Sequence, residues 1–489
     1  MAVTEMSAAA LQPGSPAAER ARFLLLWIAP LAAFAAAAFL PDVFKGGGVF
    51  ERIAAGRWML AHVAVPRADP FSFSHLGQPW APHAWVSDVA IAAAHALAGW
   101  PGVALLVGLE GGALAALTAW QGSRWLGRGA ALATLAVGAA FVAPGFGADS
   151  LTLSLPLMAT WTILLLRARE AGRAPSLWVV VVMGAWANVD ASCVVGLAIA
   201  AGLTLEAVLS PRTWSAASLT GWAAVLAASV VAAMATPFGL SGLVFDFGLF
   251  DPARLPIAAR WPAPDFFNLG PLELALLAGV FGLFWRGARL TAIRALILIG
   301  LTHLALQHLR QEALLGVAAP LLVAEPLGRA LGRAAPQPVS WRLPVPQMTL
   351  GAGLALAISV ARLALPVAPA NSADAPLAAL AQVPVALRAQ PVINDADFGD
   401  YLLYAGVRPF VDGRADMWGE DFLATDAAIQ NAVQPTTDDT LAHDGVRWAL
   451  LRPNRALVAA LESEGWRRLY ADKFAVALEN PAPASAPPR

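Results

Sequence analysis

The residues best suited to chemistry in this chain are carboxylates, histidines and arginines that gather in a few segments. Charged residues make up only 13% of the 489 residues, so these local groups stand out. The richest segment, residues 42–98, holds Asp42, Lys45, Glu51, Arg52, Arg57, Asp69, His75, His83 and Asp88. Similar groups lie elsewhere near the ends of apolar runs, at Asp190, Asp246, Asp251, Arg254, Arg260, Asp265, His303, His308, Arg310 and Glu312.

These residue types suit one kind of chemistry. A guanidinium group matches the geometry of a phosphate, and a carboxylate or imidazole can accept a proton from a hydroxyl. Together they could bind a phosphate-bearing lipid and activate an acceptor. The alternative interpretation is that the charges solvate loop surfaces and anchor helix ends.

Motifs of soluble enzymes are absent from the sequence. The GGG run at 46–48 has no strand-to-helix unit around it and predicts a hinge, not a phosphate loop. His303 and His308 are five apart, which is not the spacing of a helical metal pair. Cys193 is the only cysteine, and a net charge of −1 gives no sign of nucleic-acid binding. The sequence names no cofactor and leaves a divalent metal open.

The composition indicates which elements must position these residues. Hydrophobic residues make up 58% of the chain and mean hydropathy is +0.61, which is typical of a membrane protein. We expect a mainly α polytopic fold with about eleven spans. They are predicted at 22–41, 100–122, 128–147, 150–167, 175–189, 191–209, 215–236, 270–285, 289–306, 311–327 and 346–365.

The arginines predict an orientation. With the N-terminal segment 1–21 disordered in the cytoplasm, most arginine-rich connections fall inside, as the positive-inside rule requires. An odd number of spans then places everything after residue 365 outside. A span at 84–98 would reverse this pattern, so we expect a juxtamembrane helix there.

Three outer regions are predicted around the transmembrane domain 22–365. The first loop, 42–98, has a helical pattern at 49–63, and the loop at 237–269 contains a short interfacial helix. Residues 366–480 form a small extracytoplasmic α/β domain, with a strand at VRWALL, a helix ending on Gly465 and a hairpin at WRRLYADKFAVALEN. Residues 481–489 are a disordered tail.

Two polar features have open interpretations. Glu110 lies in the middle of a span, where a charge is costly, so it serves either function or internal packing. Its neighbours Gly108, Gly111 and Gly112 favour close helix contacts. The DGRAD run at 412–416 is either a turn with a local Arg414–carboxylate pair or an edge that faces the membrane site.

Six segments in the same order resemble a bacterial branch of the GT-C superfamily of integral-membrane glycosyltransferases, whose relatives include protein mannosyltransferases and lipid A aminoarabinose transferases. The similar segments are GRWMLAHVAVPRADPFSFSHLGQPWAPHAWVSD, WANVDASCVVGL, TPFGL, WPAPDFFN, QHLRQEALLGVAAPLL and PVINDADFGDYLLY…RPFVDGRADMWGEDFL. The resemblance extends along most of the chain.

The resemblance implies a sugar transfer from a polyprenyl-phosphate donor to an acceptor on the outer face of the bacterial inner membrane. An acidic residue of the first loop would act as the base or as a metal or acceptor ligand. Here Gly48 stands where the family has that Asp, so either Asp42 or Glu51 is expected to replace it. Asp190 stands where the family has His, whereas Asp69, His83 and Asp88 match.

The site residues follow from this pattern. Asp42, Glu51 and Asp69 are the catalytic candidates. The substrate-binding candidates are Arg52, His83, Asp88, Asp190, Arg260, Asp265, His308 and Arg310, with Arg260 and Arg310 holding the donor phosphate. The expected partners are membrane lipid, the lipid-linked sugar and envelope-glycan assembly proteins.

Two other functions compete with this one. A catalytically degenerate lipid-binding or scaffold subunit of an envelope-glycan complex would explain the lost Asp and His. A transporter is the third hypothesis, although the charges gather at one face and no inverted repeat is visible.

Overall fold

The computed structural model describes residues 23–44, 46, 48–210, 215–248, 264, 266–267, 269–339, 344–414 and 417–481. The chain divides into two compact units. The first contains Met1–Val43 and Pro101–Pro366, and the second contains Phe44–Trp100 and Val367–Arg489. Each unit is described by itself.

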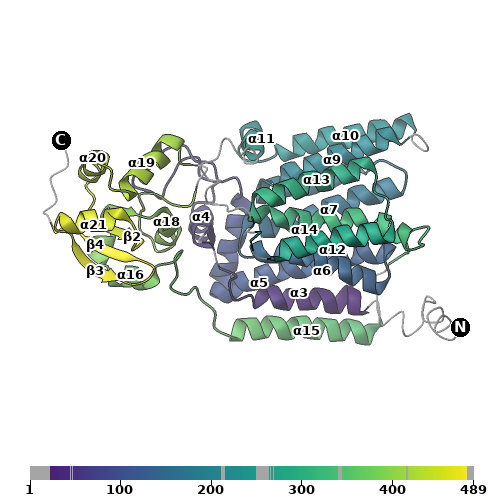
Figure 1. Cartoon of the computed structure of the whole chain (residues 1–489), viewed down its shortest axis with the longest axis horizontal. Helices are drawn as coiled ribbons and strands as arrows, with labels where there is room; N and C mark the ends of the chain where they lie inside the picture. Colours follow the sequence, from purple (N-terminus) through teal and green to yellow (C-terminus); the bar gives the residue numbers. More distant parts are fainter. Residues whose placement is uncertain are drawn as a thin grey trace. The chain divides into compact units, whose positions relative to one another are not determined.

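The first unit is a bundle whose long helices run side by side (Figure 1). In chain order its helices are η1 (Leu24–Ile28), α3 (Ala29–Ala38), the C-terminal part of α5 (Trp85–Trp125), α6 (Arg128–Val142), η2 (Ala143–Gly145), α7 (Ser150–Glu170), η3 (Leu177–Val179), α8 (Val180–Val189), α9 (Cys193–Leu209), α10 (Ala216–Ala233), α11 (Gly239–Gly248), α12 (Pro271–Arg286), α13 (Ala292–Gln307), η6 (Leu309–Gln311), α14 (Glu312–Ala330) and α15 (Val345–Ala364).

Each of the eleven predicted spans overlaps one of these helices. Within the described residues, six helices have the length and apolar composition needed to cross a membrane, and four shorter ones are also apolar. The chain is therefore a mainly helical protein with the apolar helices of a membrane protein. The number of crossings stays a prediction.

Side-chain caps and glycine set several helix ends. Ser215 and Thr291 precede α10 and α13, and each side-chain oxygen accepts a hydrogen bond from a backbone N–H of the first turn. Gly287 ends α12 in the left-handed conformation, with φ of 63°. These local signals fix where the helices start and stop, while apolar packing fixes their neighbours.

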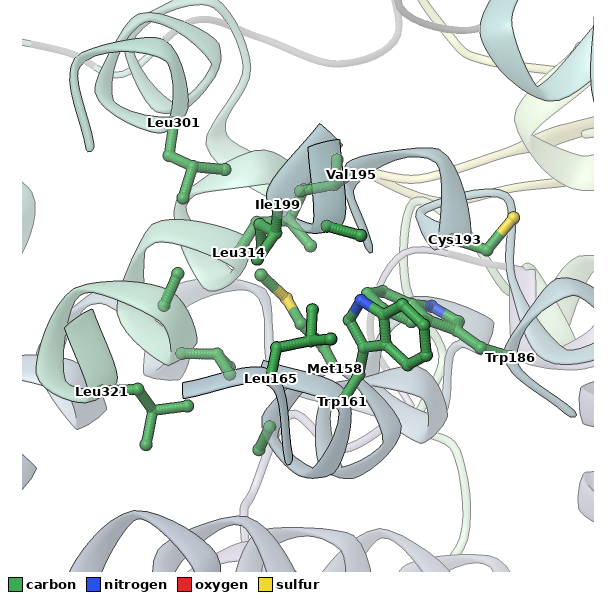
Figure 2. Packing of buried hydrophobic residues seen from close by; sticks show 14 of the residues in the cluster. Met158, Trp161, Leu165, Trp186, Cys193, Val195, Ile199, Leu301, Leu314 and Leu321 are labelled. Carbon is green, nitrogen blue, oxygen red and sulfur yellow. The ribbon is translucent and has the colours of Figure 1, made fainter. Parts of the chain in front are cut away.

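The centre of the bundle is packed around two tryptophans. Figure 2 shows Trp161 and Trp186 close together, with Met158 beside them, and all three are fully buried. The indole of Trp161 donates to the carbonyl of Gly196 at 2.9 Å. A Cβ at Gly196 would lie 2.4 Å from the Trp186 ring, so glycine is what allows α9 to approach α8.

Helix α5 is broken where the sequence predicts a boundary. Ala98 and Gly99 leave the helical conformation, and Gly99 has φ of 61°. A helix covers most of the segment 84–98 before the break, and another covers the segment 100–122 after it. That the first is juxtamembrane and the second crosses the membrane stays a prediction. On the latter, Gly108 contacts Phe34 so closely that a Cβ would lie 2.8 Å from its ring, which confirms the predicted close packing.

The second unit contains a four-stranded sheet in the order β1-β2-β4-β3. β1 (Val392–Asn394) is parallel to β2 (Trp448–Leu451), while β4 (Val476–Glu479) is antiparallel to both β2 and β3 (Arg467–Ala471). The helices are α16 (Leu377–Gln382), α17 (Val385–Arg388), α18 (Ala396–Tyr404), α19 (Glu420–Gln430), α20 (Thr436–His443) and α21 (Ala456–Ser463). The predicted strand, helix and hairpin after residue 446 are confirmed.

Much of the first loop also belongs to this second unit. Helix α4 (Gly48–His62), which the pattern at 49–63 predicts, packs against α18. Farther along the loop, the backbone N–H of Phe73 donates to the carbonyl of Pro409, and the Ser74 hydroxyl donates to that of Phe410. The sequence prediction groups this loop with the spans, whereas its contacts group it with residues 367–489.

Candidate functional site

A cluster of polar residues lies at one end of the first unit, centred on Arg310 of η6. The Arg310 Nη2 donates to Asp149 Oδ1 at 2.8 Å and to the Ser150 hydroxyl at 3.3 Å. The same nitrogen lies 3.6 Å from Asp190 Oδ2. The arginine side chain is 26% exposed, so these contacts do not enclose it completely.

Helix ends hold the two carboxylates in place. Asp149 is the N-cap of α7 and accepts from the backbone N–H of Leu151 at 3.2 Å. Asp190 follows the last residue of α8 and accepts from the Ser150 hydroxyl at 2.7 Å and from the backbone N–H of Ser192 at 2.8 Å. Both side chains are thereby fixed before any ligand arrives.

Asp42 lies in a turn that is pinned beside this cluster. The backbone N–H of Ala148 donates to the carbonyl of Val43 at 3.0 Å. The turn after α3 therefore lies against the residues that precede Asp149. The Asp42 side chain is exposed, whereas Asp190 is buried.

An apolar groove of about 210 Å³ opens between α3, α5, α6 and α14 of the same unit. Most of the residues that line it are alanine, glycine and leucine. Leu40, Ala143 and Phe146 line the end of the groove that lies toward the polar cluster. Leu40 is two residues from Asp42, and Phe146 is three residues from Asp149. The groove thus reaches the turn segments that carry the polar cluster.

Asp246 of α11 adds a further carboxyl group near Asp190. Burial, together with the charge of Asp190, raises the pKa of Asp246 to about 7. The thiol of Cys193 lies 3.7 Å from its Oδ2. Protonation of Asp246 would lower its repulsion of Asp190. Glu312, two residues beyond Arg310, is buried at the start of α14.

In the second unit, Glu51 and Arg52 lie on α4 beside Asp88. Arg52 Nη1 donates to Asp88 Oδ1 at 2.9 Å, and Asp88 is buried. Burial, followed by the nearby charge of Asp88, raises the pKa of Glu51 well above its usual range. Glu51 is therefore held toward its protonated form, which is poorly suited to accepting a proton.

Asp69 is locked in a buried ion pair with Arg414. Arg414 Nη1 donates to Asp69 Oδ1 at 2.6 Å, and its other nitrogens bind Asp412. Asp69 also accepts from the backbone N–H and hydroxyl of Ser72. Burial opposes ionisation, yet the hydrogen bond and charge of Arg414 lower the pKa of Asp69 below its usual value. This geometry supports the local-pair interpretation of the DGRAD run and gives Asp69 a structural contact.

The remaining candidates lie in different places. His83 is partly buried in the first loop, and burial lowers its pKa to about 4. His308 lies at the end of α13, two residues before Arg310. Arg260 and Asp265 lie outside the described residues. The carboxylate of Glu110 makes no recorded ion pair with the described part of the chain, and its role stays open.

No protein-family model matches the chain, and no curated protein matches it. Among solved structures, it is similar to the crystal structure of an oligosaccharyltransferase from Archaeoglobus fulgidus in the apo form. The match has a TM-score of 0.51, covers 88% of this chain and 69% of that chain, and has 12% sequence identity. The chain therefore resembles this structure in fold.

The structure brings together only some of the predicted site residues. Asp190 and Arg310 meet in the first unit, and Arg52 and Asp88 meet in the second. Asp149 was not among the predicted site residues, because the short connection GFGADS looks like a simple link between spans. An Asp-Ser pair directly before an apolar run is an N-cap signal and could have drawn notice to it.

The same geometry bears on whether the cluster suits a metal ion. Arg310 lies within ion-pair distance of both Asp149 and Asp190, in the place where a cation between those carboxylates would lie. Among the described residues, no group of three or more His, Cys, Asp or Glu side chains is arranged to hold a metal ion. As arranged here, the donor set does not fit a metal ion.

Proposed function

We propose that this protein transfers a sugar from a polyprenyl-phosphate-linked donor to an acceptor. The observation that carries the proposal is the polar cluster of Asp149, Asp190 and Arg310, which lies beside the turn of Asp42 and at one end of an apolar groove. A prenyl chain suits the groove, and a phosphate suits the partly exposed side chain of Arg310. The fold, which resembles that of an oligosaccharyltransferase, supports the same chemistry.

The proposed reaction is a single displacement at the anomeric carbon. The acceptor hydroxyl forms a bond to that carbon while its proton passes to the Asp42 carboxylate. The bond from the anomeric carbon to the phosphate oxygen breaks, and polyprenyl phosphate leaves with the bonding electrons. Arg310 stabilises the charge that develops on the phosphate, and the configuration of the sugar carbon inverts.

Asp42 suits the role of base better than Glu51. Its side chain is exposed in a turn beside the cluster, so an acceptor can reach it. Glu51 is held toward the protonated state by burial and by Asp88. Asp149 and Asp190 would orient Arg310 toward the phosphate.

The proposal is tested by assaying transfer from a radiolabelled polyprenyl-phosphate sugar by purified protein in detergent. We expect Asp42→Asn to lower the rate at least 100-fold, on the scale of losing a general base. Arg310→Gln should lower it as strongly. Glu51→Gln, the matched change at the rival carboxylate, should retain most of the activity. Full activity in the Asp42→Asn, Glu51→Gln double variant would overturn the base assignment.

A second candidate function is a catalytically degenerate lipid-binding or scaffold subunit. The pairing of Arg310 with two carboxylates favours it, because a donor phosphate must compete with them. This function predicts no transfer by the purified wild-type protein, retained binding of the polyprenyl-phosphate sugar, and co-purification with an envelope-glycan enzyme.

The finer assignments belong to the same proposal. The chain is placed in the bacterial inner membrane with eleven crossings, the N-terminus in the cytoplasm and residues 366–480 outside as an α/β domain. Within the GT-C superfamily it is assigned to the branch that contains protein mannosyltransferases and aminoarabinose transferases. The six ordered sequence motifs and the arginine distribution support these assignments.

A further inference from the structure

A second polar cavity lies at the opposite end of α7 from the site above. Asp149 caps the start of α7, whereas Glu170 ends it, about 30 Å away at 1.5 Å per residue. The cavity has a volume of about 460 Å³ and lies where α7 turns back toward α8. The proposed transfer reaction uses none of its residues.

The charged groups around this cavity are mostly positive. Arg124, Arg167 and Arg173 line it together with a single carboxylate, Glu170. Arg124 Nη1 lies 2.7 Å from Glu170 Oε2, so this pair is already balanced. Arg167 and Arg173 are exposed and have no recorded carboxylate partner within the described residues. They give the cavity two positive charges that an anion could neutralise.

Hydrogen bonds and a ring contact hold Glu170 and Arg167 in place on the wall of the cavity. Glu170 Oε1 accepts from the indole of Trp125 at 2.8 Å and from the amide of Gln121 at 3.3 Å. The guanidinium of Arg167 lies 5.1 Å from the centre of the Trp120 ring, which limits its movement. Arg167 is thus held at the rim before a ligand binds, which lowers the entropy cost of binding.

The other rim of the cavity is apolar and exposed. Trp178 lines it, and 58% of this residue is exposed. Leu177 beside it is 57% exposed, and Val181 one turn along is 68% exposed. Tryptophan beside a span end is typical of the membrane interface. A ligand here would meet cations on one side and an apolar surface on the other.

We propose that this cavity binds the phosphate headgroup of an anionic phospholipid. The phosphodiester would lie between Arg167 and Arg173, and an acyl chain would run along Trp178 and Val181. A soluble phosphate compound would satisfy the two arginines but make no contact with the apolar rim. The two surfaces together therefore favour a lipid over a free anion.

The test uses the full-length protein in nanodiscs of phosphatidylcholine with graded amounts of phosphatidylglycerol, and bound lipid is counted by native mass spectrometry after release. We expect the Arg167→Gln, Arg173→Gln double variant to bind phosphatidylglycerol about 30-fold more weakly, given about 1 kcal/mol for each arginine. Trp178→Ala should weaken binding of the lipid further.

The matched control is the Arg128→Gln, Arg286→Gln double variant. Both arginines are exposed near span ends and line neither this cavity nor the apolar groove. It should retain wild-type lipid binding. Equal loss in this control would show general attraction to an anionic surface and overturn the site. Competition by glycerol 3-phosphate at lipid-like concentrations would overturn the lipid assignment in favour of a soluble anion.

Discussion

The arginines of the two main ion-pair clusters, Arg414 and Arg310, differ in how much of the side chain is exposed. Arg414 and Asp69 each have almost no exposed side-chain surface, and their ion pair joins positions 345 residues apart. Arg310, in contrast, keeps a quarter of its side chain exposed while contacting two carboxylates. A fully enclosed pair can only position the loop, whereas a partly open guanidinium can also bind a ligand. Burial therefore separates structural from chemical candidates among residues of the same type.

His83 provides a pH test at this scale. Burial lowers its pKa to about 4, whereas in an unfolded chain it titrates near 6.5. Below pH 6.5 the unfolded chain gains a proton that the folded protein resists. The contribution of neutral, buried His83 to the folding stability is therefore complete above pH 6.5 and is lost as the pH falls toward 4. We expect up to about 1.4 kcal/mol less stability per pH unit, measured as the unfolding temperature by tryptophan fluorescence.

The variant His83→Gln should have a shallower loss of stability between pH 6.5 and 4. The slope should not vanish, because burial also lowers the pKa of His75 and of His95. The control is His443→Gln, since 86% of the His443 side chain is exposed. An unchanged slope in His83→Gln would show that His83 is not kept neutral by burial.

At the scale of elements, glycine allows the closest helix contact in the groove wall. Gly138 of α6 and Gly316 of α14 face each other, and a Cβ on either would lie 2.7 Å from the carbonyl oxygen of the other. We expect Gly316→Ala to force α6 and α14 apart and to destabilise the bundle by about 1–3 kcal/mol, as overpacking does. Thermal unfolding in detergent would measure the loss.

The control for this change is Gly300→Ala on α13, where a Cβ would have no atom within 4 Å. This variant should be as stable as wild type, or more stable by up to about 1 kcal/mol, because alanine favours a helix over glycine. Equal stability of Gly316→Ala and Gly300→Ala would contradict the close approach of α6 and α14.

The sequence was most informative about elements with strong local signals. Each predicted apolar run overlaps a helix of the bundle, and α21 ends at Ser463, shortly before Gly465 with its φ of 91°. In the loop predicted at 237–269, α11 is the expected short helix. Residues 249–263 of this loop lie outside the described part. Contacts such as that of Asp69 with Arg414 join distant positions, and no periodicity can show them.

At the scale of the whole molecule, the division into two units also escaped the sequence pattern. The sequence places residues 44–100 between two spans, so hydropathy alone assigns them to the transmembrane domain. Their partners are α18 and the segment around Phe410, more than 300 positions away. The orientation of the predicted spans, in contrast, follows directly from the distribution of arginines in the sequence. It remains a prediction that a labelling experiment can decide.

Cysteine labelling in intact cells tests the predicted topology. Cys193 is the only cysteine in the chain and is buried, so Cys193→Ala gives a background without thiols. Arg128→Cys and Lys473→Cys then each introduce one exposed thiol. The third to the eleventh predicted spans separate the two positions, and an odd number of crossings puts them on opposite sides. A membrane-impermeant maleimide should label position 473 in intact cells, and position 128 only after permeabilisation. Labelling of both from the same side would require an even number of crossings between them and would remove the basis for placing residues 366–480 outside.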